Sequence, residues 1–486
     1  MSCARVRKKQ PRPPQGAPAP GGVAGGLADL PCLAALPEHN LLASTGSNSS
    51  LPPYSTGTTG AYVRKVLENM PPSNQLKSHF IFLVHGFMGN ADELSYLEEA
   101  LNEAVAEGKE ERGDLEAPIV IHRVKCNNAS TFDGIAAGGT RLAEEVQGFV
   151  SAYVEERRAE VNDALAETEY NASISFFGYS LGGMYSRYAL SVLPFEFNAG
   201  STNVKLHPLD FCTAATPHLG IAAHTYFILP RCMEYMFAYL FGKTGKDLFR
   251  LERRKGKKWG SCFGKKSADG ASDLIFAMAT QDKYLRPLAK FRRRISFINA
   301  FGTDLQVPTA TAGMISKFSD SRHRLVENEM SDRLNVGGIE ALVFNTEQCD
   351  PPNDLQRSGS MSGKNDETLT MTKSLDSLGW TKVFVDCRKG MKGKVRCICR
   401  RPRREMVSSY VSKSRRNSTS EVIFMSSDLC KLLESSEHLH CLPTGHFVLV
   451  AWSKTQAGAQ MSEPGRPFVR EAARELICDA IEFSYR

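Results

Sequence analysis

Apolar residues in the middle of the chain alternate between short continuous runs and longer stretches with helical spacing. A continuous apolar run is typical of a strand buried on both faces, whereas apolar residues three or four apart are typical of a helix with one buried face. The runs predict strands at Phe80–Val84, Ile119–Val124, Ser173–Tyr179, Leu209–Ala214 and Ile295–Ala300. The spaced stretches predict helices at Asp92–Val105 and Gly138–Ala159, and a third from Leu181 to Leu193.

This alternation of strands and helices predicts an α/β fold. Its sheet is expected to be mostly parallel with helices on both faces, because parallel strands need crossover connections and the predicted helices supply them. Ligands of such sheets bind at the carboxyl ends of the strands. We therefore expect functional residues to follow directly after predicted strands.

The remaining segments differ in composition from this core, which is predicted within residues 61–348. Residues 1–60 are rich in Pro, Gly and Ser, and they predict a disordered tail because they carry too little apolar surface to offset chain entropy. Residues 349–420 predict a basic, Ser-rich, low-complexity insertion that contains one core strand near 380–386. Residues 421–486 are expected to return to the core and to end in an amphipathic helix.

One predicted strand runs into the pattern G-x-S-x-G, at Gly178-Tyr179-Ser180-Leu181-Gly182. A strand, this pattern and a following helix are typical of a nucleophile elbow, in which a serine sits on a sharp turn above the sheet. Glycines flank the serine because the turn leaves no room for Cβ atoms. The segment therefore predicts Ser180 as a nucleophile.

A second glycine-flanked loop follows the strand Phe80–Val84, at His85-Gly86-Phe87-Met88-Gly89. In a fold with a nucleophile elbow, this loop supplies one backbone N–H of an oxyanion hole, and the residue after the serine supplies the other. The sequence thus predicts the N–H groups of Leu181 and of Phe87 or Met88 as oxyanion donors.

A serine nucleophile needs an acid further along the chain that orients the base. Asp304 is the best candidate, because it follows the strand Ile295–Ala300. Asp386 also ends a strand-like run and is its main rival, and a solvated surface role for Asp304 stays open. Asp273 and Asp282 lie in cap-like or helical stretches and fit less well.

The base must be a histidine later in the chain than the acid. His446 follows the turn residues Pro443-Thr444-Gly445 and precedes an apolar run, as expected of a loop folded over the elbow. His440 is the reserve candidate. A structural or exposed role is the usual fate of a histidine, so the assignment depends on the elbow.

Residues 221–291 predict a cap or lid, because their pattern departs from that of the core. Tyr226–Phe241 is an aromatic, Met-rich helical stretch, and the basic run Arg250–Lys266 follows it directly. An ordinary buried helix is the alternative interpretation, since aromatic stripes at helical spacing are more often core. As a lid, the stretch would bring an apolar face and positive charge to an anionic lipid surface.

Several motifs together resemble one known family. They are His85–Gly89, Gly178–Gly183 followed by Arg187-Tyr188, Thr213–Gly220, Asn299–Pro308, Gly242–Phe249 and Leu375–Val385. In this combination the chain is similar to the eukaryotic putative serine esterase family, which comprises lipase-like α/β-hydrolases and includes fungal phospholipases. The resemblance implies an α/β-hydrolase fold, Ser180 as nucleophile, Asp304 as acid, and hydrolysis of a lipid or carboxylic ester. It is least complete at the histidine, because a long basic insertion follows the last strand.

The same motifs contain the candidate substrate-binding residues, namely His85, Tyr179, His218 and Leu219. We expect a serine esterase or lipase that acts on acyl esters of lipids, with phospholipids as a favoured subclass. The alternative is a catalytically silent hydrolase fold that serves as a lipid-binding or scaffolding module.

The composition of the chain restricts the kinds of binding partner that we expect. The net charge of +7 arises partly from basic clusters that suit an anionic membrane or lipid-droplet surface, and the clusters lack the interleaved aromatics of a nucleic-acid site. Thirteen cysteines without a disulfide-like spacing favour an intracellular location, cytoplasmic or at a membrane surface, and organelle targeting by the N-terminal tail stays open. Neither a metal site nor a cofactor is expected, since acyl transfer by serine needs none.

Overall fold

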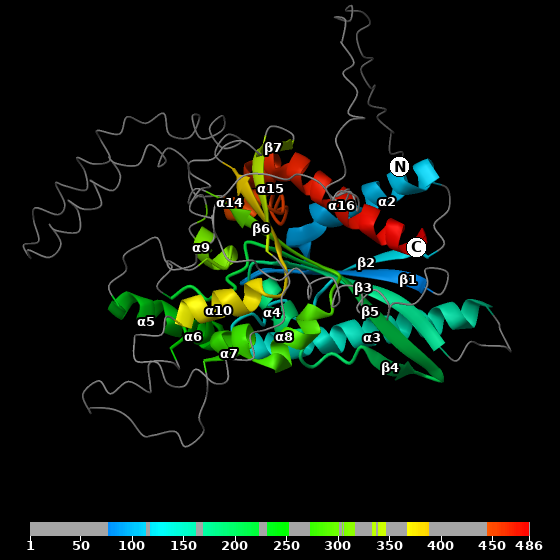
Figure 1. The fold of residues 1–486 in the computed structure, drawn as a ribbon, viewed down its shortest axis with the longest axis horizontal. Coiled ribbons are helices and arrows are strands. Elements are labelled where there is room, and N and C mark those ends of the chain that lie inside the picture. The colour runs from blue at the N-terminus through cyan, green and yellow to red at the C-terminus, as the bar shows by residue number, and fades with distance from the viewer. Residues whose placement is uncertain are drawn as a thin grey trace, which may run out of the picture. The chain divides into compact units, whose positions relative to one another are not determined.

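The computed structural model describes most of the predicted core (Figure 1). The described residues are 76–112, 117–161, 169–222, 231–251, 273–300, 304, 306–315, 333–336, 339–346, 367–387 and 445–485. The predicted tail at residues 1–60, most of the insertion at residues 349–420, and His440 lie outside them.

Nine strands of the described chain form one sheet, in the order β2-β1-β3-β5-β6-β9-β8-β7, with β4 paired to β5. Their bounds are β1 Leu76–Val84, β2 Ile119–Arg123, β3 Glu169–Tyr179, β4 Glu196–Ala199, β5 Thr202–Ala214, β6 Arg293–Asn299, β7 Arg333–Val336, β8 Ile339–Asn345 and β9 Thr381–Asp386. Neighbouring strands are parallel along the order from β2 to β9, whereas the pairs β4–β5, β7–β8 and β8–β9 are antiparallel. The predicted mostly parallel sheet is confirmed.

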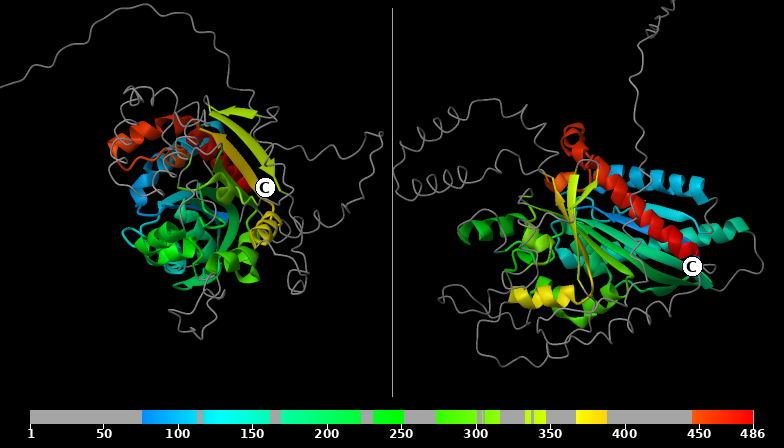
Figure 2. Two further views of the ribbon diagram at one scale, coloured as in Figure 1. Left: turned by 90° about the vertical axis from the view of Figure 1, so that its left-hand side faces the viewer. Right: turned by 45° about the horizontal axis from the view of Figure 1, so that its top comes forward.

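Helices cover both faces of this sheet, as Figures 1 and 2 show. On one face lie α2 (Ser95–Arg112) and the C-terminal α16 (Arg466–Tyr485), which pack against each other. On the other lie α3 (Ile135–Val161), α4 (Leu181–Ala189) and α8 (Asp282–Ala289). The shorter helical segments are η3 Ala91–Leu94, α5 Arg231–Leu240, α6 Gly242–Leu248, α7 Leu274–Thr280, α9 Thr309–Ala312, α10 Glu367–Asp376, α14 Gly445–Val448, α15 Gln456–Ser462 and η7 Glu463–Gly465.

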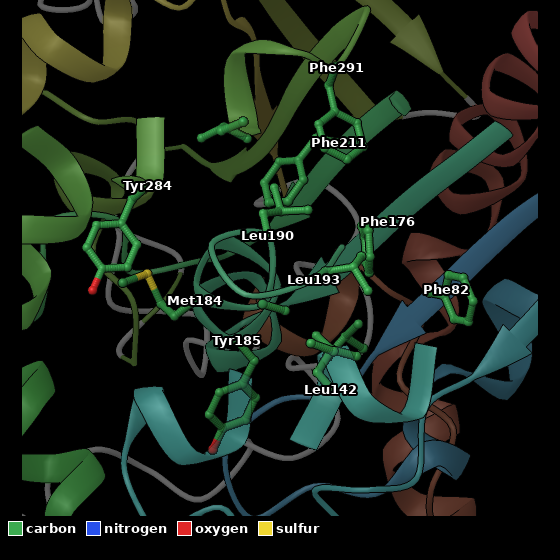
Figure 3. Packing of buried hydrophobic residues seen from close by; sticks show 14 of the residues in the cluster. Phe82, Leu142, Phe176, Met184, Tyr185, Leu190, Leu193, Phe211, Tyr284 and Phe291 are labelled. Carbon is green, nitrogen blue, oxygen red and sulfur yellow. The ribbon is translucent and has the colours of Figure 1, made fainter. Parts of the chain in front are cut away.

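The larger core fills the space between the sheet and the α3, α4 and α8 layer (Figure 3). Phe82, Phe176 and Phe211 come from the adjacent strands β1, β3 and β5, and the Phe82 and Phe176 rings stack with centroids 5.7 Å apart. Phe291 packs edge-on against the Phe211 ring at 5.5 Å. Burial of each such side chain contributes about 1.5–3 kcal/mol, so this layer fixes the central strands on which the elbow stands.

The sequence predictions for the core agree with these elements, and the strand predicted near 380–386 is β9, which pairs between β6 and β8. The antiparallel pair β7–β8 was not anticipated. Residues of β8 alternate between buried and partly exposed positions at its start, so no continuous apolar run marks the strand.

The segment between β5 and β6 divides into two parts. Buried residues of α7 and α8, among them Ile275, Met278 and Leu285, belong to the larger core. By contrast, Ala238 of α5 forms a small separate cluster with Phe249 and Leu251. Among the described residues, α5 is thus separate from the larger core, whereas α6 contributes Leu248 to that core. Residues 226–230 of the predicted lid helix and 252–266 of the basic run lie outside the described residues, so the cap stays a prediction.

Candidate active site

Ser180 occupies a strained turn between β3 and α4. Its φ of 54° and ψ of −123° lie in a region that L-residues rarely adopt, and such strain clusters at functional sites. The flanking glycines make the turn possible: a Cβ on Gly182 would come within 2.2 Å of the Val84 carbonyl oxygen, and one on Gly178 within 2.4 Å of the Gly183 Cα. The Ser180 N–H donates to the Ala214 carbonyl at 2.8 Å, which holds the turn against β5.

His446 joins Ser180 to Asp304 through both ring nitrogens. Its Nε2 lies 3.1 Å from Ser180 Oγ, and its Nδ1 lies 2.7 Å from Asp304 Oδ2. All three residues are buried. They come from α14, from the turn before α4 and from the segment after β6, so the fold brings together residues up to 266 positions apart. Nδ1 donates to the carboxylate, which leaves Nε2 as an acceptor for the serine hydroxyl.

Both carboxylate oxygens of Asp304 accept hydrogen bonds from neighbouring groups. Asn299 Nδ2 donates to Oδ2 at 3.0 Å, and the N–H groups of Gln306 and Val307 donate to Oδ1 at 2.8 and 2.9 Å. These bonds fix the orientation of the carboxylate. The rival Asp386 is also buried at the end of β9, but the carboxylate bonded to His446 is that of Asp304.

The loop after β1 lies directly beside the nucleophile. A Cβ on Gly86 would come within 2.9 Å of Ser180 Cβ, so only glycine allows this approach. The Met88 N–H donates to Thr131 Oγ1 at 3.0 Å. Leu181 is the first residue of α4, where an N–H has no acceptor within the helix. Of the three predicted oxyanion donors, Phe87 and Leu181 are thus better candidates than Met88, whose N–H is already engaged.

Two of the predicted substrate-binding residues lie next to the triad. The Tyr179 ring is 5.0 Å from the His446 ring, and burial raises the pKa of its hydroxyl well above the usual value. His85 is also buried, and its Nδ1 lies 3.1 Å from the Gly86 carbonyl oxygen. Burial lowers the pKa of His85, which favours a neutral ring beside the loop.

The other two belong to the protein framework. Arg187 Nη1 donates to His218 Nδ1 at 3.3 Å, and His218 Nε2 lies 3.1 Å from Thr213 Oγ1. Burial, followed by the charges of Arg187 and Lys382, lowers the pKa of His218 well below its usual value, so the ring is neutral. Leu219 is buried and its N–H donates to Thr311 Oγ1 at 3.0 Å. Because their polar groups are engaged within the protein, His218 and Leu219 fit a structural role better than contact with substrate.

Sequence reasoning missed Asn299 and Thr131. Asn299 is the last residue of β6 and lies within the motif that contains Asp304, so its position could have indicated a functional role. Thr131 has no such signal, because its contact with Met88 joins residues 43 positions apart.

The described residues contain no group of three or more His, Cys, Asp or Glu side chains that could hold a metal ion. Among the helices described, none is both long and apolar enough to cross a membrane.

Comparison with known proteins agrees with the fold. Residues 74–317 match the model of the family described as putative serine esterase, which covers half of the chain, so the protein belongs to this family. The resemblance predicted from the motifs is confirmed. Ser180 and Asp304 fall inside the matched region, whereas His446 lies outside it and is placed by the structure alone.

Three curated fungal proteins are each similar to about half of the chain. Putative lipase ROG1 of Saccharomyces cerevisiae is 27% identical over 247 residues, which are 50% of this chain and 29% of that protein. Putative lipase YDL109C of the same yeast is 25% identical over 245 residues, 49% of this chain and 30% of its own. Putative lipase C4A8.10 of Schizosaccharomyces pombe is 26% identical over 261 residues, 53% of this chain and 28% of its own. The match thus spans less than a third of each relative.

Proposed function

We propose that the protein is a serine esterase or lipase that hydrolyses acyl esters of lipids, with phospholipids as a favoured class. The observation that carries the proposal is the hydrogen-bonded series Ser180–His446–Asp304, with contacts of 3.1 and 2.7 Å. The names of the fungal relatives, which describe them as lipases, support a lipid substrate.

The geometry suits a two-step acyl transfer. Ser180 Oγ attacks the ester carbonyl while His446 Nε2 takes the hydroxyl proton, and Asp304 stabilises the imidazolium that results. The N–H groups of Leu181 and Phe87 hold the oxyanion. His446 then returns the proton to the departing alcohol, which leaves an acyl ester on Ser180. Water, deprotonated by His446, hydrolyses this ester and frees the serine. Neither a metal nor a cofactor takes part.

A panel of esters tests this function. Hydrolysis is measured on short soluble esters, acylglycerols, phospholipids and acyl thioesters, with the Ser180→Ala variant as the blank for each. Activity on at least one lipid ester, absent from the variant, supports the proposal and names the class. A folded protein that is inactive on the whole panel would instead point to a silent lipid-binding module.

An exposed apolar surface beside the site suits contact with lipid. Its exposed members are Met88, Phe132, Met236, Tyr239 and Leu240. Met88 belongs to the loop after β1, and this loop adjoins Phe132 and the end of α5, because the Phe87 ring contacts the rings of Phe132 and of Phe241, the residue after Leu240, at centroid distances of 4.8 and 5.2 Å. Lys246 Nζ lies over the Tyr239 ring, at 4.9 Å from its centroid, so positive charge adjoins the apolar side chains. We therefore propose that this surface meets an anionic membrane or lipid droplet, and that the protein is intracellular and peripherally associated with it.

Leu240→Glu tests the lipid contact. The change removes an apolar contact and adds a negative charge, so we expect hydrolysis of vesicle-borne phospholipid to fall by about 10-fold, while hydrolysis of a short soluble ester and the melting temperature stay unchanged. Leu240 is better suited than Tyr235 or Phe237, which are partly buried against the cluster that contains Ala238 and Phe249.

Val192→Glu is the matched control, since Val192 is an exposed apolar residue that follows α4 and is not a member of the surface. Equal activity of Leu240→Glu and wild type on vesicles, or equal losses on vesicles for Leu240→Glu and Val192→Glu, would contradict the lipid contact.

A further inference from the structure

A second buried carboxyl group lies next to the candidate site, and the mechanism above does not use it. Glu93 belongs to η3, which follows the loop after β1, and the residue is 6% exposed. Its carboxyl packs against Gly89, where an added Cβ would come within 2.2 Å of Glu93 Oε2. Gly89 therefore makes room for this side chain, and the loop and the carboxyl are fitted to each other.

The carboxyl group also meets the segment that follows His446. Lys454 Nζ lies 3.9 Å from Glu93 Oε1 and donates to the Met88 carbonyl oxygen at 3.3 Å. Nearby, Ser453 Oγ lies 2.7 Å from Ser95 Oγ. The segment that carries the candidate base is thus fastened to the segment that carries a candidate oxyanion donor.

Groups from the loop after β1 and from the segment that begins at His446 both act on the charge of Glu93. Burial raises the pKa of its carboxyl above the usual value, and the Trp452 indole, the Lys454 ammonium, the charge of His446 and the Gly86 N–H offset part of this rise. The ionised carboxyl therefore interacts favourably with a protonated His446. The other titratable groups near these two are Tyr179, on which Glu93 and Asp304 both act, and His85, on which Lys454 acts.

We propose that Glu93 is a positioning residue, which together with Lys454 holds the oxyanion loop against the His446 segment and whose charge stabilises the imidazolium. Its contacts are with Gly89 and Lys454, so it acts through the loop and through the segment that follows His446. This inference rests on the proposed function, because a positioning role has meaning only if His446 transfers a proton.

Glu93→Gln keeps the size of the side chain and removes its charge. We expect kcat on a short soluble ester to fall by about 10-fold with KM unchanged, because the loss concerns the transition state. Loss of the negative charge disfavours the imidazolium, so the acid limb of the pH–rate profile should move to lower pH by about 0.5 to 1 unit. Glu93→Asp, which retains the charge, should restore the position of the limb.

Lys454→Met provides a second variant at a more exposed position. Its expected shift of the acid limb is opposite to that of Glu93→Gln. Without the ammonium, the charge of Glu93 is less compensated, so the acid limb should move to higher pH. Asp92→Asn is the matched control: its carboxylate is the neighbouring acid, is exposed and pairs with Arg123, and its loss should move neither kcat nor the limb.

Three outcomes separate the possibilities. An active wild type with a Glu93→Gln variant that keeps its kcat and its acid limb overturns the positioning role alone. A lower melting temperature with the limb unmoved in both Glu93→Gln and Lys454→Met overturns it as well and leaves Glu93 a packing residue. A wild type that hydrolyses no ester of the panel overturns the proposed function, and the role of Glu93 with it.

Discussion

Replacement of Ser180 by alanine is expected to lower kcat on any ester substrate by about 10⁴-fold or more, with the fold intact. Alanine removes the attacking oxygen and its hydrogen bond to His446 Nε2, and no described residue supplies a second nucleophile at that position. Alanine also fits the space of the serine, so the strained turn and its backbone bond to Ala214 are preserved. The rate that remains should come from oxyanion binding alone.

Kinetics of single and double variants test this expectation. Because a triad works as a unit, Ser180→Ala/His446→Ala should be no slower than Ser180→Ala alone. Ser191→Ala is the matched control, since its hydroxyl bonds only to the Tyr188 carbonyl among the described contacts. A Ser180→Ala variant that retains substantial activity would remove the nucleophile from the proposed mechanism.

The second large effect is expected from Asp304→Asn, which should lower kcat by about 10⁴-fold. The carboxylate accepts from His446, Asn299 and two backbone N–H groups, so an amide must turn its own N–H toward one of these donors. If the amide N–H meets Nδ1, the imidazole is held in the wrong tautomer and its Nε2 cannot accept the serine proton. Circular dichroism should show an unchanged fold.

Asp386→Asn and His440→Ala serve as the controls, because these residues are the rivals of Asp304 and His446. Both variants should keep activity close to that of the wild type. A greater loss from Asp386→Asn than from Asp304→Asn would reassign the acid, and a loss from His440→Ala with His446→Ala fully active would reassign the base.

The central fold could be predicted from the sequence because its strands are buried on both faces. Such strands appear as continuous apolar runs, and β1, β3, β5 and β6 each contain one of the predicted runs, although β3 and β5 begin several residues before it. The elbow could be predicted too, since its geometry demands glycine at Gly178 and Gly182 for steric reasons that act locally.

What the sequence could not determine depends on contacts between distant segments. The Asp304–His446 contact joins residues 142 positions apart, so the choice between His446 and His440 needed the structure. The same holds for His218, whose position in a motif suggested substrate contact but whose ring nitrogens are engaged by Arg187 and Thr213. Glu93 likewise gave no signal, because its partner Lys454 follows it by hundreds of residues.

The most direct measurement is the reaction of the full-length protein with a fluorophosphonate, followed by mass spectrometry of the labelled peptide. Such reagents phosphonylate a serine hydroxyl only where a neighbouring base activates it. We expect a single adduct on Ser180, formed much more slowly in Asp304→Asn and absent from Ser180→Ala. A folded protein that takes up no label, or an ester-hydrolysing protein labelled at a residue other than Ser180, would contradict the proposed active site.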